Sequence, residues 1–238
     1  MCYSAQASFL TAATLAPISV SCLNSAFRRH RKIWPLATIP MVFGIQQAME
    51  GLIWTSLDHH HPQEAEMAAK VYLFFAMAWW PFWGPLTAFV ASETKWRKAV
   101  FGAWTILSTG WFFLAYLPCL IDSRSKIQAT VVHHSIRYTF SDEMIVDYDN
   151  RIPVTILYVI FSAVPLILST PRSRSYIPMT ILFISIVVAN YFYSHAYTSV
   201  WCISAAIISS YCLVYFRGLD RVYSQSSVQD GQLPNFLS

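Results

Sequence analysis

Residues 34–57 read WPLATIPMVFGIQQAMEGLIWTSL, and this stretch carries one charged side chain, Glu50. A helix that crosses a membrane needs about 20 mostly apolar residues, so this segment is long and apolar enough to span a bilayer. Further stretches of the same character cover residues 5–22, 68–91, 99–121, 153–170, 176–194 and 199–216. We therefore predict an all-α fold, a polytopic membrane bundle of about seven transmembrane helices.

The composition of the whole chain agrees with this fold class. Of its 238 residues 55% are hydrophobic and only 12% are charged, whereas soluble domains carry about 25% charged residues. This balance excludes an ordinary soluble globule and a disordered chain. The lipid bilayer is thus the first expected partner of the protein.

Lysine and arginine residues predict the orientation of the bundle, because they are retained on the cytoplasmic side. Eleven basic residues fall on one side of the predicted spans: Arg28, Arg29, Arg31, Lys32, Lys95, Arg97, Lys98, Arg172, Arg174, Arg217 and Arg221. The other side has five: Lys70, Arg124, Lys126, Arg137 and Arg151. We expect the N-terminus outside and the C-terminus in the cytoplasm. The first span lacks a preceding basic region, so it is expected to stay in the protein rather than to act as a signal peptide.

The net charge of +4 comes from this basic rim. No basic stripe with interleaved aromatic residues lies outside the predicted spans, and we expect no binding to nucleic acid.

The loop at 122–152 is the only sizeable segment that we expect outside the membrane. Within it, Ile127–His134 and Ser135–Phe140 alternate apolar and polar side chains imperfectly, which predicts a small β-hairpin or meander on the outer face. It could act as a lid over the bundle. We take residues 1–222 as one seven-span domain and expect a disordered cytoplasmic tail at 223–238, which is rich in Ser, Gln, Asp and Gly.

Glu50 is the strongest candidate for a functional residue. It lies roughly 10 Å below the outer end of its span at the 1.5 Å rise of a helix, where an ionisable group usually faces a partner or a watery cavity. Gln46 and Gln47 share its helix face by spacing, and Lys70 at the start of the next span is an expected ion partner. The alternative is a structural Glu50 that bonds to a neighbouring helix.

Two polar residues near the end of the sixth predicted span, Asn190 and Tyr193, are expected to line the same outer vestibule. Their alternative role is in an interfacial tyrosine belt.

Histidines gather at the predicted outer face and are candidate ligands for zinc or copper, because imidazole suits both metals. The candidates are His59, His61, His133, His134 and His195. No standard metal-binding spacing accompanies them, so a hydrated acidic loop that contains histidines is the alternative. In an oxidising outer compartment, two of Cys2, Cys119 and Cys202 could form a disulfide and leave one free thiol, and Cys2–Cys202 is the pairing that we expect. Alternatively, Cys2 becomes the N-terminal residue when Met1 is removed, and its amine and thiol then form a chelating or nucleophilic group.

Three motifs resemble an uncharacterised family of bacterial multi-span membrane proteins, catalogued as a domain of unknown function. They are Met1-Cys-Tyr-Ser-Ala-Gln-Ala-Ser-Phe9, Phe43-Gly-Ile-Gln-Gln-Ala-Met-Glu-Gly51 and Ser199-Val-Trp-Cys-Ile-Ser-Ala-Ala206. Members commonly open Met-Cys-Phe-Ser-Ala, and Tyr3 replaces that Phe here. The resemblance implies a multi-pass protein of the bacterial inner membrane and draws attention to Cys2, Glu50 and Cys202. It implies no activity.

We expect an integral membrane protein that binds or senses a small ligand or metal ion in an outer-facing polar vestibule around Glu50. A membrane-embedded, metal-dependent lipid hydrolase is one alternative. The span count resembles that of the seven-span hydrolases related to alkaline ceramidases, but their paired histidines are absent from the last span here. An accessory subunit of a membrane complex is the second alternative, and the sequence leaves open whether the protein is an enzyme and what its oligomeric state is.

Overall fold

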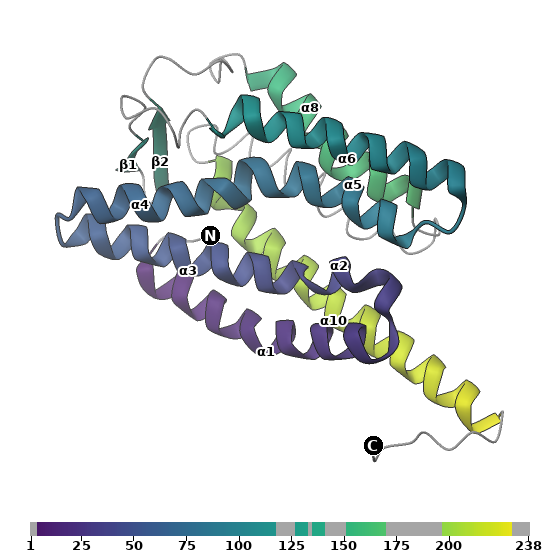
Figure 1. Ribbon diagram of the computed structural model, residues 1–238. Helices are drawn as coiled ribbons and strands as arrows, with labels where there is room; N and C mark the ends of the chain where they lie inside the picture. Colours follow the sequence, from purple (N-terminus) through teal and green to yellow (C-terminus); the bar gives the residue numbers. More distant parts are fainter. Residues whose placement is uncertain (1–3, 118–126, 133–134, 141–150, 170–196, 230–238) are drawn as a thin grey trace.

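The computed structural model describes residues 4–117, 127–132, 135–140, 151–169 and 197–229, and they are predominantly helical (Figure 1). The α-helices are α1 (Ala5–Arg29), α2 (Trp34–Ala37), α3 (Ile39–Asp58), α4 (Pro62–Leu73), α5 (Trp80–Ala91), α6 (Lys95–Ala115), α8 (Arg151–Ser169) and α10 (Tyr197–Gln229). A 3₁₀-helix η1 (Arg31–Ile33) precedes α2, a π-helix η2 (Phe74–Trp79) joins α4 to α5, and two strands, β1 (Ile127–Val132) and β2 (Ser135–Phe140), form a small sheet.

Three helical segments of the described residues are long and apolar enough to cross a membrane. They run over Ala5–Arg29, Arg31–Asp58 and Pro62–Ala91, which are the first three predicted spans with slightly extended ends. Helices α6, α8 and α10 occupy the positions of the fourth, fifth and seventh predicted spans. The sixth, at 176–194, lies outside the described residues, so the count of seven and the orientation stay predictions.

Helix α3 lies between α1 and α4 (Figure 1), and it also packs against α10. Helix α5 continues the line of α4 and packs against α6 and α8. Many large apolar side chains, such as Leu10, Ile106 and Val214, point away from the bundle and are exposed. An exposed apolar surface of this kind is what a lipid-facing helix requires.

Prolines and caps determine where several helices begin. Ser4 caps α1, because its hydroxyl accepts a hydrogen bond from the backbone N–H of Ala7 at 3.2 Å and so satisfies one of the free donors of the first turn. Pro35, Pro40 and Pro62 stand in the first turns of α2, α3 and α4, where the missing N–H costs nothing.

Pro81 explains the π-helix in the middle of the third span. A proline has no N–H to donate to the preceding turn, so backbone carbonyls of that turn need other donors. The indole N–H of Trp111 donates to the carbonyl oxygen of Met77 at 3.0 Å, and the hydroxyl of Tyr158 donates to that of Ala76 at 2.8 Å. Side chains from α6 and α8 thus replace hydrogen bonds that the third span lacks.

The predicted β-hairpin is confirmed. Strands β1 and β2 pair antiparallel, with Ile127 opposite Phe140 and Val132 opposite Ser135. Ile127 and Ile136 are buried, and they belong to one apolar cluster with side chains of α3, α4 and α6. The hairpin therefore packs onto the end of the bundle where α3 turns into α4, which we call the hairpin end.

Helix α10 extends further than the sequence predicts. It runs to Gln229, so residues 223–229 are helical, whereas the whole stretch 223–238 was expected to be disordered. Ion pairs between Asp220 and the end of α1 hold the last part of the helix beside the bundle, which gives a physical reason for its continuation. Residues 230–238 lie outside the described residues.

Candidate functional site

The buried polar face of α3 is the candidate site. Glu50 is 0% exposed, Gln47 is 2% exposed and Gln46 is 5% exposed. Because residues three and four apart on a helix share a face, Gln46 and Gln47 stand one turn from Glu50. The spacing in the sequence predicts this shared face, and the face points into the bundle.

Glu50 and Gln47 are bonded to each other. The amide nitrogen Nε2 of Gln47 donates to the carboxyl oxygen Oε2 of Glu50 at 3.4 Å, and both side chains make further interactions. A carboxyl group and an amide group of one helix face are thus in contact inside the bundle.

Gln46 presents an acceptor without a hydrogen-bond partner among the described residues. Its side-chain oxygen Oε1 is buried and bonds to no other group in that part of the chain. A buried polar atom that is left unsatisfied costs about 1–3 kcal/mol, and a bound water or ion is one explanation for such an atom. Two kinds of oxygen acceptor, a carboxyl and an amide, thus lie one helical turn apart in the bundle interior.

Apolar residues enclose this face. A Cβ atom on Gly51 would lie 2.8 Å from the ring of Phe9, so glycine at this position lets α1 approach α3 closely. One turn further toward the hairpin end, Trp54 is buried in the same cluster as Tyr72 and Ile136 of the hairpin. Glu50 itself has no exposure to solvent, and the outer-facing polar vestibule around it stays a prediction.

Lys70 does not pair with Glu50. Its ammonium group lies 2.8 Å from the carboxylate of Glu66, four residues earlier on α4, and its backbone carbonyl accepts a hydrogen bond from the hydroxyl of Tyr116. A glutamate at i−4 on the same helix is the nearer partner for a lysine. The structure thus places Lys70 apart from the cluster on α3.

Two of the candidate metal ligands, His59 and His61, flank the turn between α3 and α4. Their ring centroids are 6.4 Å apart, and Nδ1 of His61 lies 3.4 Å from Oε2 of Glu64. Between them, His60 has a φ of 59°, a left-handed conformation that non-glycine residues adopt rarely. Within the part of the chain that the structure describes, no three His, Cys, Asp or Glu side chains gather as a metal site.

Several predicted site residues lie outside the described part of the chain, or their side chains do. They are His133, His134, Asn190, Tyr193, His195 and Cys2, together with the side chain of Cys202 on α10. Their proposed roles, the Cys2–Cys202 disulfide included, stay predictions. So do the zinc or copper site, the lipid hydrolase and the accessory subunit.

The comparison with known families agrees with the resemblance in the sequence. A family of unknown function, DUF6629, matches residues 1–227. The chain belongs to the DUF6629 family. The DUF6629 match spans all of the described helices except the last two residues of α10, and it includes the Glu50 face. No curated protein and no solved structure matches the chain.

Sequence analysis missed two features of this DUF6629 protein that bear on the site. The first is the unsatisfied oxygen of Gln46, since spacing predicts a shared face but not which atoms lack partners. The second is the contact of Phe9 with Gly51, because a glycine in an apolar span signals a close approach without naming the neighbour. Gly51 itself, a small residue next to Glu50, was the one hint of that contact in the sequence.

Proposed function

We propose that this protein is a multi-pass membrane protein that binds a small monovalent cation at the buried face of α3. The observation that carries the proposal is Glu50, a carboxyl group with no exposure to solvent inside an apolar span, beside the unsatisfied oxygen of Gln46. An ionisable side chain in the middle of a membrane costs about 3 kcal/mol on insertion scales and is usually functional.

Charge balance favours a single positive charge. This face of α3 carries one carboxyl group and the uncharged amides of Gln46 and Gln47, so it suits a single positive charge better than a divalent ion, whose excess charge is costly in a low-dielectric interior. Carboxyl and amide oxygens are hard ligands and suit hard cations. Sodium, potassium or ammonium therefore fits this face better than zinc or copper.

Access to the site passes the hairpin end. Trp54, one helical turn from Glu50 toward that end, packs in one apolar cluster with Ile127 and Ile136 of the hairpin, so a movement of this cluster would open a path to Glu50. Binding of a cation would then be sensed at the outer surface through the position of the hairpin. We place the protein in the bacterial inner membrane with this end outside, in line with the distribution of basic residues.

The thermal unfolding midpoint of the detergent-purified protein tests the proposal. It is measured in sodium, potassium, ammonium and choline chloride at equal ionic strength and at several pH values. A bound cation at ten times its Kd stabilises by about 1.4 kcal/mol, which corresponds to roughly 3–6 °C in a chain of this size.

The variants separate the site from general salt effects. We expect Glu50→Gln and Gln46→Leu to lose the cation-dependent shift. Matched controls at exposed positions of α4, Glu64→Gln and Gln63→Leu, should keep it. Equal midpoints in all four salts at every pH, or an unchanged shift in Glu50→Gln, would refute the proposal.

A further inference from the structure

Basic side chains gather at the end of the bundle opposite the hairpin, which we call the basic end. It comprises the end of α1, η1, the start of α6 and the last turns of α10 (Figure 1). Its described basic residues are Arg28, Arg29, Arg31, Lys32, Lys95, Arg97, Lys98, Arg217 and Arg221. The start of α6 is also bonded to α8, because the guanidinium of Arg97 donates to the carbonyl oxygen of Leu168.

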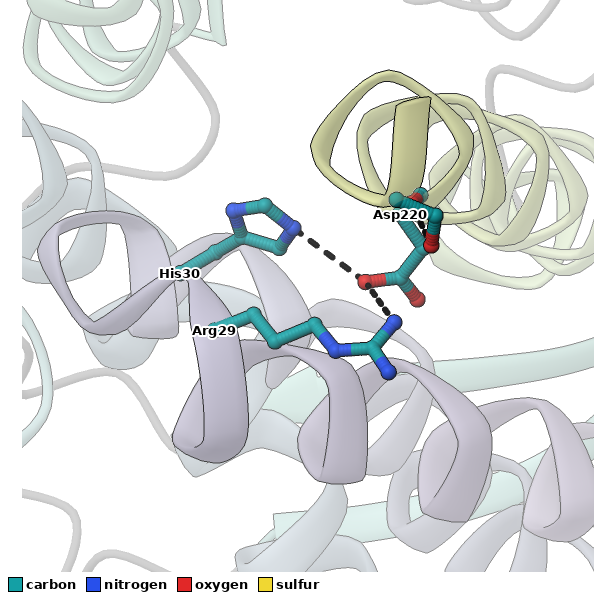
Figure 2. A network of polar contacts seen from close by, with 4 residues as sticks. Arg29, His30 and Asp220 are labelled. Carbon is teal, nitrogen blue, oxygen red and sulfur yellow. Dashed lines mark hydrogen bonds and ion pairs between the residues drawn. The ribbon is translucent and has the colours of Figure 1, made fainter. Parts of the chain in front are cut away.

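The acidic residues at this end are already neutralised. The carboxylate of Asp220 lies 3.3 Å from the guanidinium of Arg29 and 3.2 Å from the ring of His30 (Figure 2). The carboxylate of Glu93 lies 2.9 Å from the ammonium of Lys32. The charge that remains on the surface is therefore positive.

Seven basic residues of the basic end have no acidic partner within the described residues. They are Arg28, Arg31, Lys95, Arg97, Lys98, Arg217 and Arg221. Arg217 and Arg221 stand four residues apart on α10, so they share a face, and both are exposed. Like charges at this spacing repel each other. An anion between the two guanidinium groups would attract both and so offset the repulsion.

The basic end lies at the level of a membrane surface. The first candidate span ends at Arg29 and the second begins at Arg31. Trp34 and Trp96 are exposed here, and exposed tryptophans at span ends are typical of the headgroup region. The anions at such a surface are lipid phosphates.

We propose that the basic end binds the headgroups of anionic phospholipids, with a headgroup phosphate held between Arg217 and Arg221. Guanidinium groups bind phosphate oxygens through paired hydrogen bonds, and clusters of basic residues next to a transmembrane helix attract anionic lipids. The ion pairs of Asp220 with Arg29 and His30 hold α10 against α1, so the two arginines keep a fixed position at the membrane surface (Figure 2).

Native mass spectrometry of the full-length protein in detergent tests this proposal. The protein is titrated with phosphatidylglycerol, with phosphatidylcholine and with inorganic phosphate. We expect wild type to bind phosphatidylglycerol in preference to phosphatidylcholine. The double variant Arg217→Gln, Arg221→Gln should bind phosphatidylglycerol about 25-fold more weakly, at about fivefold for each basic residue removed.

The control variant is Arg137→Gln, an exposed basic residue of β2 at the hairpin end, and we expect it to bind lipid as wild type does. The thermal midpoints without lipid show whether each variant is folded. Equal binding of the two lipids, wild-type affinity in the double variant, or an equal response to inorganic phosphate would overturn the proposal.

Discussion

A close approach of two helices in the bundle offers a stringent test of the packing. A Cβ atom on Gly84 of α5 would overlap the carbonyl oxygen of Ser162 on α8 and lie 3.2 Å from that of Phe161. Both neighbours are backbone atoms, which cannot rotate away. Gly84→Ala therefore forces α5 and α8 apart.

The expected cost follows from two opposing effects. Overpacking of a tight contact costs about 1–3 kcal/mol, and alanine in place of glycine in a helix gains about 0.5–1 kcal/mol. The net loss is up to about 2.5 kcal/mol, which lowers the thermal midpoint by at most roughly 5–10 °C. Gly110 of α6 is the matched control, because a Cβ atom there has no neighbour within 4 Å among the described residues.

Thermal unfolding of the purified variants in one detergent measures the difference. Gly84→Ala should lower the midpoint, whereas Gly110→Ala should leave it unchanged or raise it by about 1–4 °C. If Gly84→Ala unfolds at or above the wild-type midpoint, α5 and α8 do not pack as described.

Three further predictions concern polar contacts. Trp111→Phe removes the donor to the carbonyl of Met77 and should lower the thermal midpoint by the equivalent of about 1–3 kcal/mol; an unchanged midpoint would contradict this role of the indole. Asp220→Asn should weaken the attachment of the last turns of α10 and speed their backbone hydrogen exchange, and unaltered exchange would argue against the attachment. The pKa of Glu93 lies below its ordinary value of 4.5, because the ammonium of Lys32 donates a hydrogen bond to the carboxylate and attracts its charge. The stabilisation by this pair is therefore complete above pH 4.5 and is lost as the pH falls through the lowered pKa. An NMR titration that gives Glu93 a pKa above 4.5 would refute the ion pair with Lys32.

Much of the fold can be predicted from the sequence, because lipid imposes a simple requirement on each segment. Span length and low charge locate the first three helical segments, and alternation of apolar residues locates the hairpin at Ile127–Phe140. The extension of α10 could not be predicted in this way, since it depends on the contact of Asp220 with Arg29 and His30. In the sequence His30 and Asp220 are 190 residues apart.

The candidate site is predictable in part for a similar reason. Helical spacing places Gln46, Gln47 and Glu50 on one face, and the cost of a charge in lipid turns that face inward. The partner of Lys70 was predicted wrongly, because a glutamate on its own helix competes with Glu50. Which side chains of α3 and α4 meet Ile127 and Ile136 of the hairpin depends on long-range packing that no local pattern encodes.

Isothermal titration of the full-length protein with sodium, potassium and ammonium chloride tests the central claim most directly. The account predicts one site per chain for at least one of these ions in wild type and in Glu64→Gln. It predicts no binding in a folded Glu50→Gln. Binding of equal affinity and stoichiometry in Glu50→Gln would contradict the assignment of the cation site to α3.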